Sequence, residues 1–361
     1  MKVNCLQEDF NRALSTGLRV VPAKAIMPIT TCFLLSADLG KLTVTSTDLA
    51  SAIILSIDAE VKEPGAVAIP AKLLAEFVSN MPSDVISLES TKSLLNVRCG
   101  KAKVKLNGME SSDFPNAAYQ ATSTVKIGLE VLKKAVIKAS TCAAKDNSRP
   151  VLTGLDMIFE GKNLIIASAD GYRISYDRLA VEGDYKGEVI VPAEILSNFV
   201  KMAKSDQVSI ETAGGKVAFA SDGSKFVSSL LQGPFPSWRA AIPVSYSTKA
   251  TVKSAEMLSA IKILSSISKQ GSGILRVTVN PTEIALRVVE REIGDAESEV
   301  AAKVEGKEVK IGLRCEYFLE ALSSTFSEEV TLEFGTLQSP LLVRSSVDSF
   351  QVIAPMMMPD L

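Results

Sequence analysis

A strand–proline–helix segment occurs twice in the chain in nearly the same form. Residues 187–200 read Gly-Glu-Val-Ile-Val-Pro-Ala-Glu-Ile-Leu-Ser-Asn-Phe-Val, and residues 65–78 read Gly-Ala-Val-Ala-Ile-Pro-Ala-Lys-Leu-Leu-Ala-Glu-Phe-Val. The apolar residues before each proline favour a buried strand. Proline has a fixed φ and no N–H group, so it can end the strand and open a helix. Each segment therefore predicts a strand followed directly by an amphipathic helix.

A third, weaker copy of this segment covers residues 307–320, with Gly312 at the place of the proline. The copies recur at intervals of roughly 120 residues, which is the size of a domain rather than of a solenoid repeat. Three such copies account for a chain of 361 residues. We therefore predict three repeated domains, at residues 1–121, 122–244 and 245–361.

Each copy is predicted to be an α+β domain, with two helices packed on one face of an antiparallel sheet. Apolar residues at helical spacing place the first helices at residues 6–20, 129–144 and 254–268. The second helices follow Pro70, Pro192 and Gly312. Sheet edges must be paired or blunted, so consecutive domains are expected to pair edge to edge. The two free ends could pair with a second chain, and a head-to-tail contact that closes makes a ring.

Composition argues against a catalytic or metal-binding role. The chain contains no histidine, the commonest general base and metal ligand. Its five cysteines form no Cys-x-x-Cys pair and are expected to be reduced packing residues. Asp48 and Asp170 follow strands in matching copies, which predicts structural turns. We expect no catalytic residue, metal or cofactor, although an enzyme that uses carboxylates or lysine remains an alternative.

Hydropathy and charge bear on location and partners. The sequence has no apolar run of about 18 residues, and its first ten residues carry charges, so we expect a cytoplasmic protein without a membrane span. The net charge of −2 argues weakly against nucleic-acid binding. Lysines nevertheless recur at helical spacing, at positions 134, 138 and 145, 201 and 204, and 262 and 269. Such stripes are either solvated helix faces or, if the repeats align them, a track for phosphates.

Eight short motifs carry a resemblance to a known family. They read Thr-Ser-Thr-Asp-Leu at 45–49, Ile-Pro-Ala-Lys at 69–72, Ser-Asp-Phe-Pro at 112–115, Arg-Pro-Val-Leu at 149–152, Ala-Asp-Gly-Tyr-Arg at 169–173, Ile-Val-Pro at 190–192, Leu-Gln-Gly-Pro-Phe-Pro at 231–236 and Val-Ile-Ala-Pro-Met at 352–356. No single motif is specific, but the ordered set at domain spacing is. On these residues the chain resembles the β sliding clamps of bacterial DNA polymerase III over essentially its whole length.

The resemblance implies a DNA sliding clamp without catalytic residues. Such a clamp is a head-to-tail homodimer whose six domains form a ring, which encircles duplex DNA without sequence readout and confers processivity on the replicative polymerase. The implied partners are double-stranded DNA, a second copy of the chain, the DNA polymerase III alpha subunit, the clamp loader, and other polymerases and repair proteins that carry short clamp-binding peptides. A scaffold that kept the fold but lost its traffic on DNA remains an alternative.

The resemblance also implies two sets of site residues. The DNA-binding set is Lys24, Lys72, Lys134, Lys138, Lys145, Arg149, Lys201 and Lys204. The peptide-binding pocket is formed by Val151, Leu152, Ala169, Gly171, Tyr172, Arg173, Ile174, Pro243, Val352, Ala354, Pro355 and Met356. A groove of aliphatic and methionine side chains with an arginine at its rim suits an extended apolar peptide. The tail departs from the family pattern, because Ala354 and Met357 replace a methionine and an arginine and residues 359–361 are extra. A differently shaped pocket is therefore expected.

Overall fold

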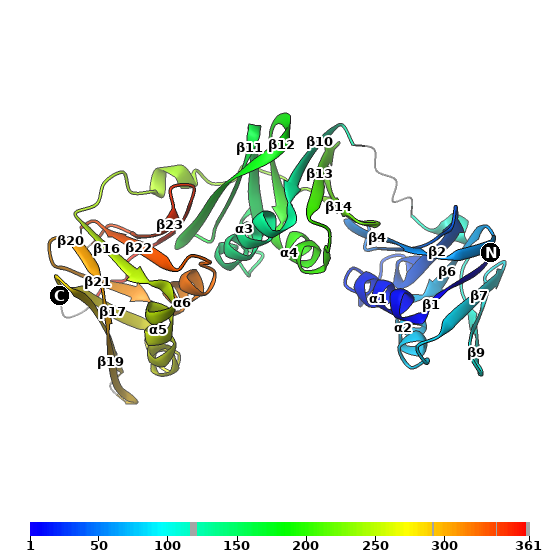
Figure 1. Ribbon diagram of the computed structural model, residues 1–361, viewed down its shortest axis with the longest axis horizontal. Coiled ribbons are helices and arrows are strands. Elements are labelled where there is room, and N and C mark those ends of the chain that lie inside the picture. Colours follow the sequence, from blue (N-terminus) through cyan, green and yellow to red (C-terminus); the bar gives the residue numbers. More distant parts are fainter. Residues whose placement is uncertain (116–120, 291, 337, 359–361) are drawn as a thin grey trace. The chain divides into compact units, whose positions relative to one another are not determined.

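The computed structural model describes residues 1–115, 121–290, 292–336 and 338–358 (Figure 1). The chain divides into two compact units, one formed by Met1–Leu129 with Met202–Leu230 and the other by Glu130–Lys201 with Leu231–Leu361. This division differs from the three predicted domains, whose boundaries stay a prediction. Part of the expected linker, residues 116–120, and the extra residues 359–361 lie outside the described residues. Within the described part of the chain, no helix is long and apolar enough to cross a membrane.

The first unit contains two antiparallel sheets and the helices α1 (Gln7–Gly17) and α2 (Ala71–Ser79), which pack against each other. One sheet has the order β5 (Glu60–Glu63), β1 (Lys2–Leu6), β7 (Val85–Thr91), β8 (Leu94–Cys99), β9 (Ala102–Asn107). The other has the order β10 (Ser123–Gly128), β13 (Gln207–Ala213), β14 (Lys216–Ser221), β15 (Ser224–Ser229), β4 (Ser51–Asp58), β3 (Lys41–Thr47), β2 (Cys32–Asp38), β6 (Gly65–Pro70). The first unit also contains two short 3-10 helices, η1 (Pro28–Thr31) and η2 (Ser111–Asp113).

The second unit repeats this plan. Its helices are α3 (Leu129–Cys142), α4 (Ala193–Met202), α5 (Ser254–Ser268) and α6 (Cys315–Ser323), and its 3-10 helices are η3 (Pro150–Thr153) and η4 (Trp238–Ala241). One sheet has the order β20 (Lys303–Gly306), β16 (Thr248–Lys253), β22 (Glu329–Phe334), β23 (Leu341–Ser346), β24 (Ser349–Ile353), β12 (Arg173–Pro192), with β11 (Gly154–Ala169) paired to β12. The other has the order β19 (Gly294–Ala301), β18 (Glu283–Glu290), β17 (Ile274–Val279), β21 (Val309–Arg314).

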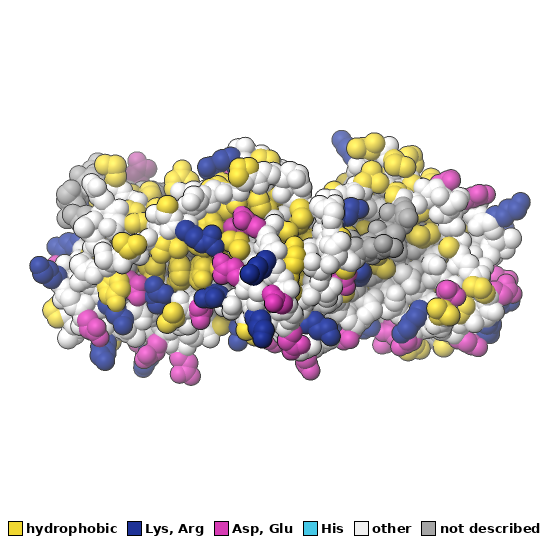
Figure 2. All heavy atoms as spheres, turned by 90° about the horizontal axis from the view of Figure 1, so that it is seen from above, with side chains coloured by type: hydrophobic (Ala, Val, Ile, Leu, Met, Phe, Trp, Pro, Cys, Tyr) yellow, Lys and Arg dark blue, Asp and Glu magenta, His cyan; other side chains and the backbone are white. Residues whose placement is uncertain are grey.

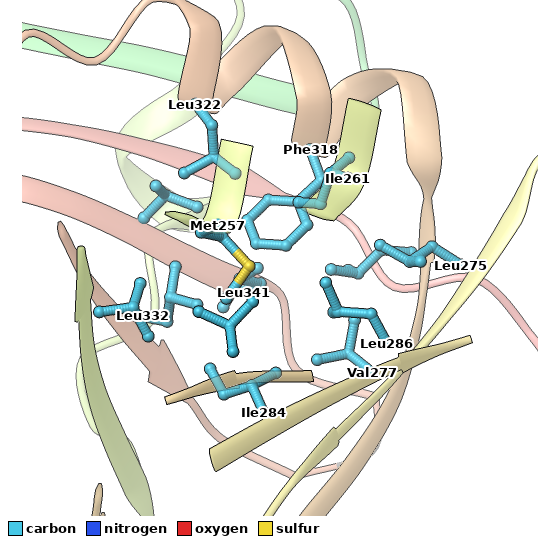
Figure 3. Close-up of a cluster of buried hydrophobic side chains, with 14 of the residues drawn as sticks. Met257, Ile261, Leu275, Val277, Ile284, Leu286, Phe318, Leu322, Leu332 and Leu341 are labelled. Atoms are coloured by element: carbon cyan, nitrogen blue, oxygen red, sulfur yellow. The ribbon is translucent and has the colours of Figure 1, made fainter. Parts of the chain in front are cut away.

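Helices packed on antiparallel sheets confirm the predicted α+β class. In the second unit α5 and α6 lie side by side, and Met257, Ile261 and Phe318 point from them into a core against Leu275 and other strand residues (Figure 3). These side chains are completely buried. Burying one of them stabilises the fold by about 1.5–3 kcal/mol relative to leaving it exposed. The helix pair and the sheets are therefore held together mainly by this apolar layer.

The predicted edge-to-edge pairing between neighbouring repeats is also present. In the first unit β15 pairs antiparallel with β4, which places Phe226 opposite Ile53. In the second unit β12 pairs antiparallel with β24, which places Tyr176 opposite Phe350. Each pairing converts two strand edges into one continuous sheet, so the exposed backbone groups of both edges are satisfied.

The strand–proline–helix prediction holds in two copies and is wrong in its detail in the third. β6 ends at Pro70 and β12 ends at Pro192, and a helix begins at the next residue in both. In the third copy β21 continues to Arg314 before α6 begins, so Gly312 is not the counterpart of the prolines. Gly312 has a different role. The Met356 N–H donates to its carbonyl at 2.8 Å, and a Cβ on Gly312 would lie 2.7 Å from Cγ of Met358. Its missing side chain therefore lets the C-terminal segment lie on β21.

The first strand of each repeat was not predicted from the sequence. These strands are β1, β10 and β16, and they pair with β7, β13 and β22. Each has only five or six residues, and charged residues interrupt its apolar alternation. Leu6 was expected on the apolar stripe of the first helix. Leu6 is instead the last residue of β1, before that helix begins, and it is 57% exposed.

Candidate functional site

A cavity of about 230 Å³ lies in the second unit, where strand ends and two 3-10 helices meet. β11 ends at Ala169, β12 begins at Arg173, and β24 carries Val352. The residues that line the cavity are Arg149, Leu152, Ala169, Gly171, Tyr172, Arg173, Ile174, Pro236, Ser237, Trp238, Ala241, Pro340, Val352 and Ala354. Most of these side chains are apolar, so the cavity can receive apolar groups of a ligand.

The turn between β11 and β12 places Tyr172 at the rim of this cavity. Asp170 Oδ1 accepts hydrogen bonds from the backbone N–H groups of Tyr172 at 2.9 Å and Arg173 at 3.0 Å. Gly171 has a φ of +96°, a conformation that residues with side chains rarely adopt. The turn leaves Tyr172 62% exposed. Asp170 is thus the turn residue that the sequence predicted. Asp48 has the same role, because its Oδ1 accepts from Ser51 N at 2.6 Å.

A buried apolar cluster packs next to the cavity, and some of its members, such as Trp238 and Val352, also line the cavity. It joins residues of β11, β12, β23 and β24 with Trp238 of η4, and the rings of Tyr176 and Phe350 stack at 4.7 Å. Trp238 Nε1 donates to Asp156 Oδ2 at 3.0 Å. Burial raises the pKa of Asp156 to about 6, although the hydrogen bond from Trp238 opposes this rise. The cluster fixes the wall of the cavity with packing rather than with exposed polar contacts.

Arg173 supplies the buried positive charge of the site. Its side chain is only 4% exposed, and its Nε lies 2.9 Å from Asp170 Oδ2. Its Nη1 donates to Glu320 of α6, and its guanidinium lies 4.2 Å from the centre of the Tyr317 ring. The Tyr317 ring is itself 6.4 Å from that of Tyr172. The arginine is therefore held from several sides before any ligand arrives.

Most of the residues predicted for a peptide pocket meet at this cavity. Those that line it are Leu152, Ala169, Gly171, Tyr172, Arg173, Ile174, Val352 and Ala354. Val151, Pro243, Pro355 and Met356 do not line it. Met356 instead forms a bridge with Gly312 on β21. Arg149, which was predicted to bind DNA, also lines the cavity.

Five lining residues were missed by sequence reasoning. They are Pro236, Ser237, Trp238, Ala241 and Pro340. Four of them belong to a single connecting segment that begins with the last residue of the motif at 231–236, where a signal was available. The only tryptophan of the chain lies there, and a buried tryptophan in a connecting segment indicates a packed surface rather than a solvated loop.

The predicted DNA-binding residues differ in exposure. Lys24, Lys72, Lys134, Lys145, Arg149, Lys201 and Lys204 are exposed. Lys138 is not, so the prediction of one exposed stripe on α3 is wrong at this residue. Its Nζ lies 2.8 Å from Asp177 Oδ1, and both side chains are at most 7% exposed. It also contacts the hydroxyl of Ser349, which is opposite Asp177 in the β12–β24 pair. Lys138 is thus turned toward the strands, whereas Lys134, one turn earlier, lies over the Phe326 ring at 5.9 Å.

The surface that Figure 2 shows is uneven in character. Hydrophobic side chains gather in patches, and single Lys, Arg, Asp and Glu side chains border them (Figure 2). Within the described residues, no group of three or more His, Cys, Asp or Glu side chains could hold a metal ion. All five cysteines are buried and free.

Comparison with known proteins gives matches over the whole chain. Three domain families match in order: the N-terminal domain of the DNA polymerase III beta subunit at residues 1–118, its central domain at 126–237 and its C-terminal domain at 239–359. The beta sliding clamp of Streptomyces coelicolor is 25% identical over 360 residues, covering 97% of this chain and 96% of that protein. The beta sliding clamp of Synechococcus elongatus is 24% identical and covers 95% of each.

Solved structures match the fold with similar coverage. The DNA polymerase sliding clamp of Bacillus subtilis has a TM-score of 0.93 at 23% identity, covering 99% of both chains. A sliding clamp of Pseudomonas aeruginosa, solved bound to griselimycin, has a TM-score of 0.91 at 22% identity, covering 99% of this chain and 100% of that one.

Proposed function

The chain belongs to the DNA polymerase III beta subunit family, the sliding clamps that confer processivity, and from this we propose that its cavity binds short peptides of DNA polymerases and repair proteins. The observation that carries the proposal is the convergence of three separate segments of the chain on one apolar cavity, represented by Leu152, by Tyr172 with Arg173, and by Val352. An extended peptide can place apolar side chains there while its backbone stays at the surface. The family is one of processivity factors rather than catalytic enzymes, and we assign this chain no catalytic residue.

The shape of the cavity suggests a specific peptide preference. Ala354 lines it, where the family pattern has a methionine. A smaller side chain leaves more room at that end. We therefore expect the peptides that bind here to carry a bulkier apolar residue at that end than relatives accept.

We further propose that two copies of the chain close head to tail around duplex DNA, opened by a separate clamp loader, in the cytoplasm. The exposed lysines of the second unit, such as Lys134, Lys145 and Lys201, would then contact phosphates without reading the sequence. Lys138 is omitted from this set because its charge is buried against Asp177. Ring topology, rather than affinity for DNA, would keep the protein on its template.

The pocket can be tested with its own tryptophan. Trp238 is the only tryptophan of the chain and lines the cavity, so its fluorescence should change when a peptide from the DNA polymerase III alpha subunit binds. Tyr172→Ala should lower the affinity for the peptide by roughly tenfold or more, as for an exposed aromatic anchor. This affinity is measured independently by fluorescence anisotropy of the peptide. Tyr246→Ala is the matched control, because Tyr246 is exposed and lies outside the cavity lining. Equal affinity of the two variants would contradict the assignment of the pocket.

The clamp mechanism needs a separate test on circular DNA. The protein is loaded with its loader onto a nicked circle, the complex is washed, and the circle is then linearised. Retention on the circle and escape after cutting are expected for a topological ring. Equal retention on both forms would mean ordinary binding and would reject the ring. No retention on either form would favour the scaffold alternative.

A further inference from the structure

Glu320 does not line the cavity, but it contacts Arg173, which does. It projects from α6 three residues after Tyr317, and both side chains contact Arg173. Residues three apart on a helix are neighbours on its surface, so α6 presents a ring and a carboxylate to the same guanidinium. Asp170 contacts that guanidinium from the β11–β12 turn.

The charges of this group do not balance at the cavity. One guanidinium faces two carboxylates, Asp170 and Glu320, whose side chains are 13% and 27% exposed, so the three side chains together carry a formal net negative charge. Lys145 Nζ lies 3.6 Å from the other oxygen of Glu320, but its side chain is 76% exposed. Water and salt screen an exposed partner of this kind, and such pairs contribute little. Asp170 and Glu320 therefore neutralise Arg173, which offers little attraction to an additional anion. Arg149, which is exposed and also lines the cavity, is the other cation there, so this neutralisation concerns the position beside Arg173.

We propose that Glu320 is a positioning residue that sets the charge selectivity of the pocket, because it adds a second carboxylate to Arg173, which Asp170 alone would neutralise. The site then favours neutral apolar peptides and disfavours a carboxylate next to Arg173. Specificity of this kind arises from a repulsive element as much as from attraction. The inference rests on the proposed peptide-binding function of the cavity.

The test compares peptides that differ in one charge. A clamp-binding peptide of the alpha subunit is prepared with Gln, and separately with Glu, at each position in turn, and affinities are measured by anisotropy. In the wild-type protein the acidic peptide should bind more weakly at the position beside Arg173. Glu320→Gln removes the charge and retains an acceptor, so the ratio of the acidic to the neutral Kd should fall about fivefold there, as expected for losing one nearby, partly exposed charge. The Kd of the neutral peptide should change less than twofold.

A matched control separates position from net charge. Glu316→Gln makes the same charge change one turn earlier on α6, where Glu316 is half exposed and lies 4.0 Å from Arg314. It should leave the Kd ratio unchanged, and Glu320→Asp should keep the wild-type ratio. Equal weakening of both peptides by Glu320→Gln would mean a merely structural role and would overturn the inference, as would no change. If the wild-type protein binds neither peptide, the proposed pocket itself fails instead.

If the Glu320→Gln variant does not fold, a measurement on the wild-type protein still tests the inference. In the wild-type protein, added NaCl should narrow the gap between the neutral and acidic peptides, because salt screens the repulsion at the open cavity. A gap that stays constant from low to high salt would overturn the inference without any variant.

Discussion

Two buried cations in the second unit look alike in the sequence and differ in the structure. Arg173 is held by two carboxylates and a tyrosine ring beside an open cavity. Lys138 is paired with a single carboxylate, Asp177, and a serine hydroxyl. Arginine presents a planar fork that can satisfy several partners at once, whereas lysine is a compact point charge. The first cation is therefore part of a recognition surface, and the second fastens α3 to the β12–β24 pair.

The difference shows that charge alone does not identify a functional residue. Both side chains were expected to contact a ligand, Arg173 a peptide and Lys138 a phosphate. What separates them is the set of neighbours that the fold supplies from distant parts of the chain. Removing the partners of each cation in turn tests these two roles.

The largest effect is expected from breaking the lysine pair. Lys138→Met preserves most of the side-chain volume but leaves Asp177 buried without its cation. Removing one partner of a buried pair typically costs about 3–5 kcal/mol, and we expect the free energy of unfolding at pH 7.5, measured in urea, to fall by this amount. Lys134→Met, one turn earlier and exposed, should change it by less than about 0.5 kcal/mol. If both variants are equally stable, the ion pair of Lys138 with Asp177 does not hold α3 on the β12–β24 pair.

A smaller effect is expected at Asp156, whose carboxylate accepts the hydrogen bond from the cavity-lining Trp238. Its pKa, raised to about 6 by burial, exceeds the ordinary value of 3.8, so the folded state binds this proton more tightly than the unfolded state. The resulting stabilisation is complete below about pH 4 and is lost as the pH rises through 6. Asp156→Asn retains an acceptor for Trp238 Nε1. The stability of the variant relative to wild type should therefore be greater at pH 7.5 than at pH 4.5 by about 2 kcal/mol.

This pH comparison has its own control in Asp177. Burial also raises the pKa of Asp177 to about 6, while Lys138 opposes the rise. Asp177→Asn loses the ion pair as well as the titrating group, so it should be destabilised at pH 7.5 and not stabilised. A gain in stability there would show that the pair with Lys138 contributes nothing at neutral pH.

The sequence predicted much of the fold because its strongest signals are local. A proline after an apolar run determines where β6 and β12 end, and this could be seen directly. In the third copy the same reasoning chose Gly312, because no local signal shows that the C-terminal segment will lie against that residue. The first strands escaped prediction for a similar reason, since a five-residue strand such as β1 is specified mainly by its partner β7.

The candidate site divides along the same line. Asp170, Gly171 and Tyr172 form one turn and could be predicted together. Trp238 and Pro340 reach the cavity only through the pairing of β12 with β24 and the packing of the connecting segment, which are long-range features. The burial of Lys138 was beyond prediction for the same reason. Helical spacing gives the direction of a Cα–Cβ bond, and it does not say where a long side chain finds a carboxylate.

The smallest effect on stability is expected at Lys145, whose pair with Glu320 is exposed. Lys145→Ala should change the free energy of unfolding by less than about 1 kcal/mol, because exposed ion pairs contribute little. If it contacts a phosphate, its removal should reduce the slope of log K against log salt for linear duplex DNA by about 0.9. Lys138→Met, where it folds, should leave that slope unchanged, because its charge is buried. A reversed result, with the slope dependent on Lys138 and not on Lys145, would mean that the buried lysine turns outward to DNA and that the contrast with Arg173 does not hold.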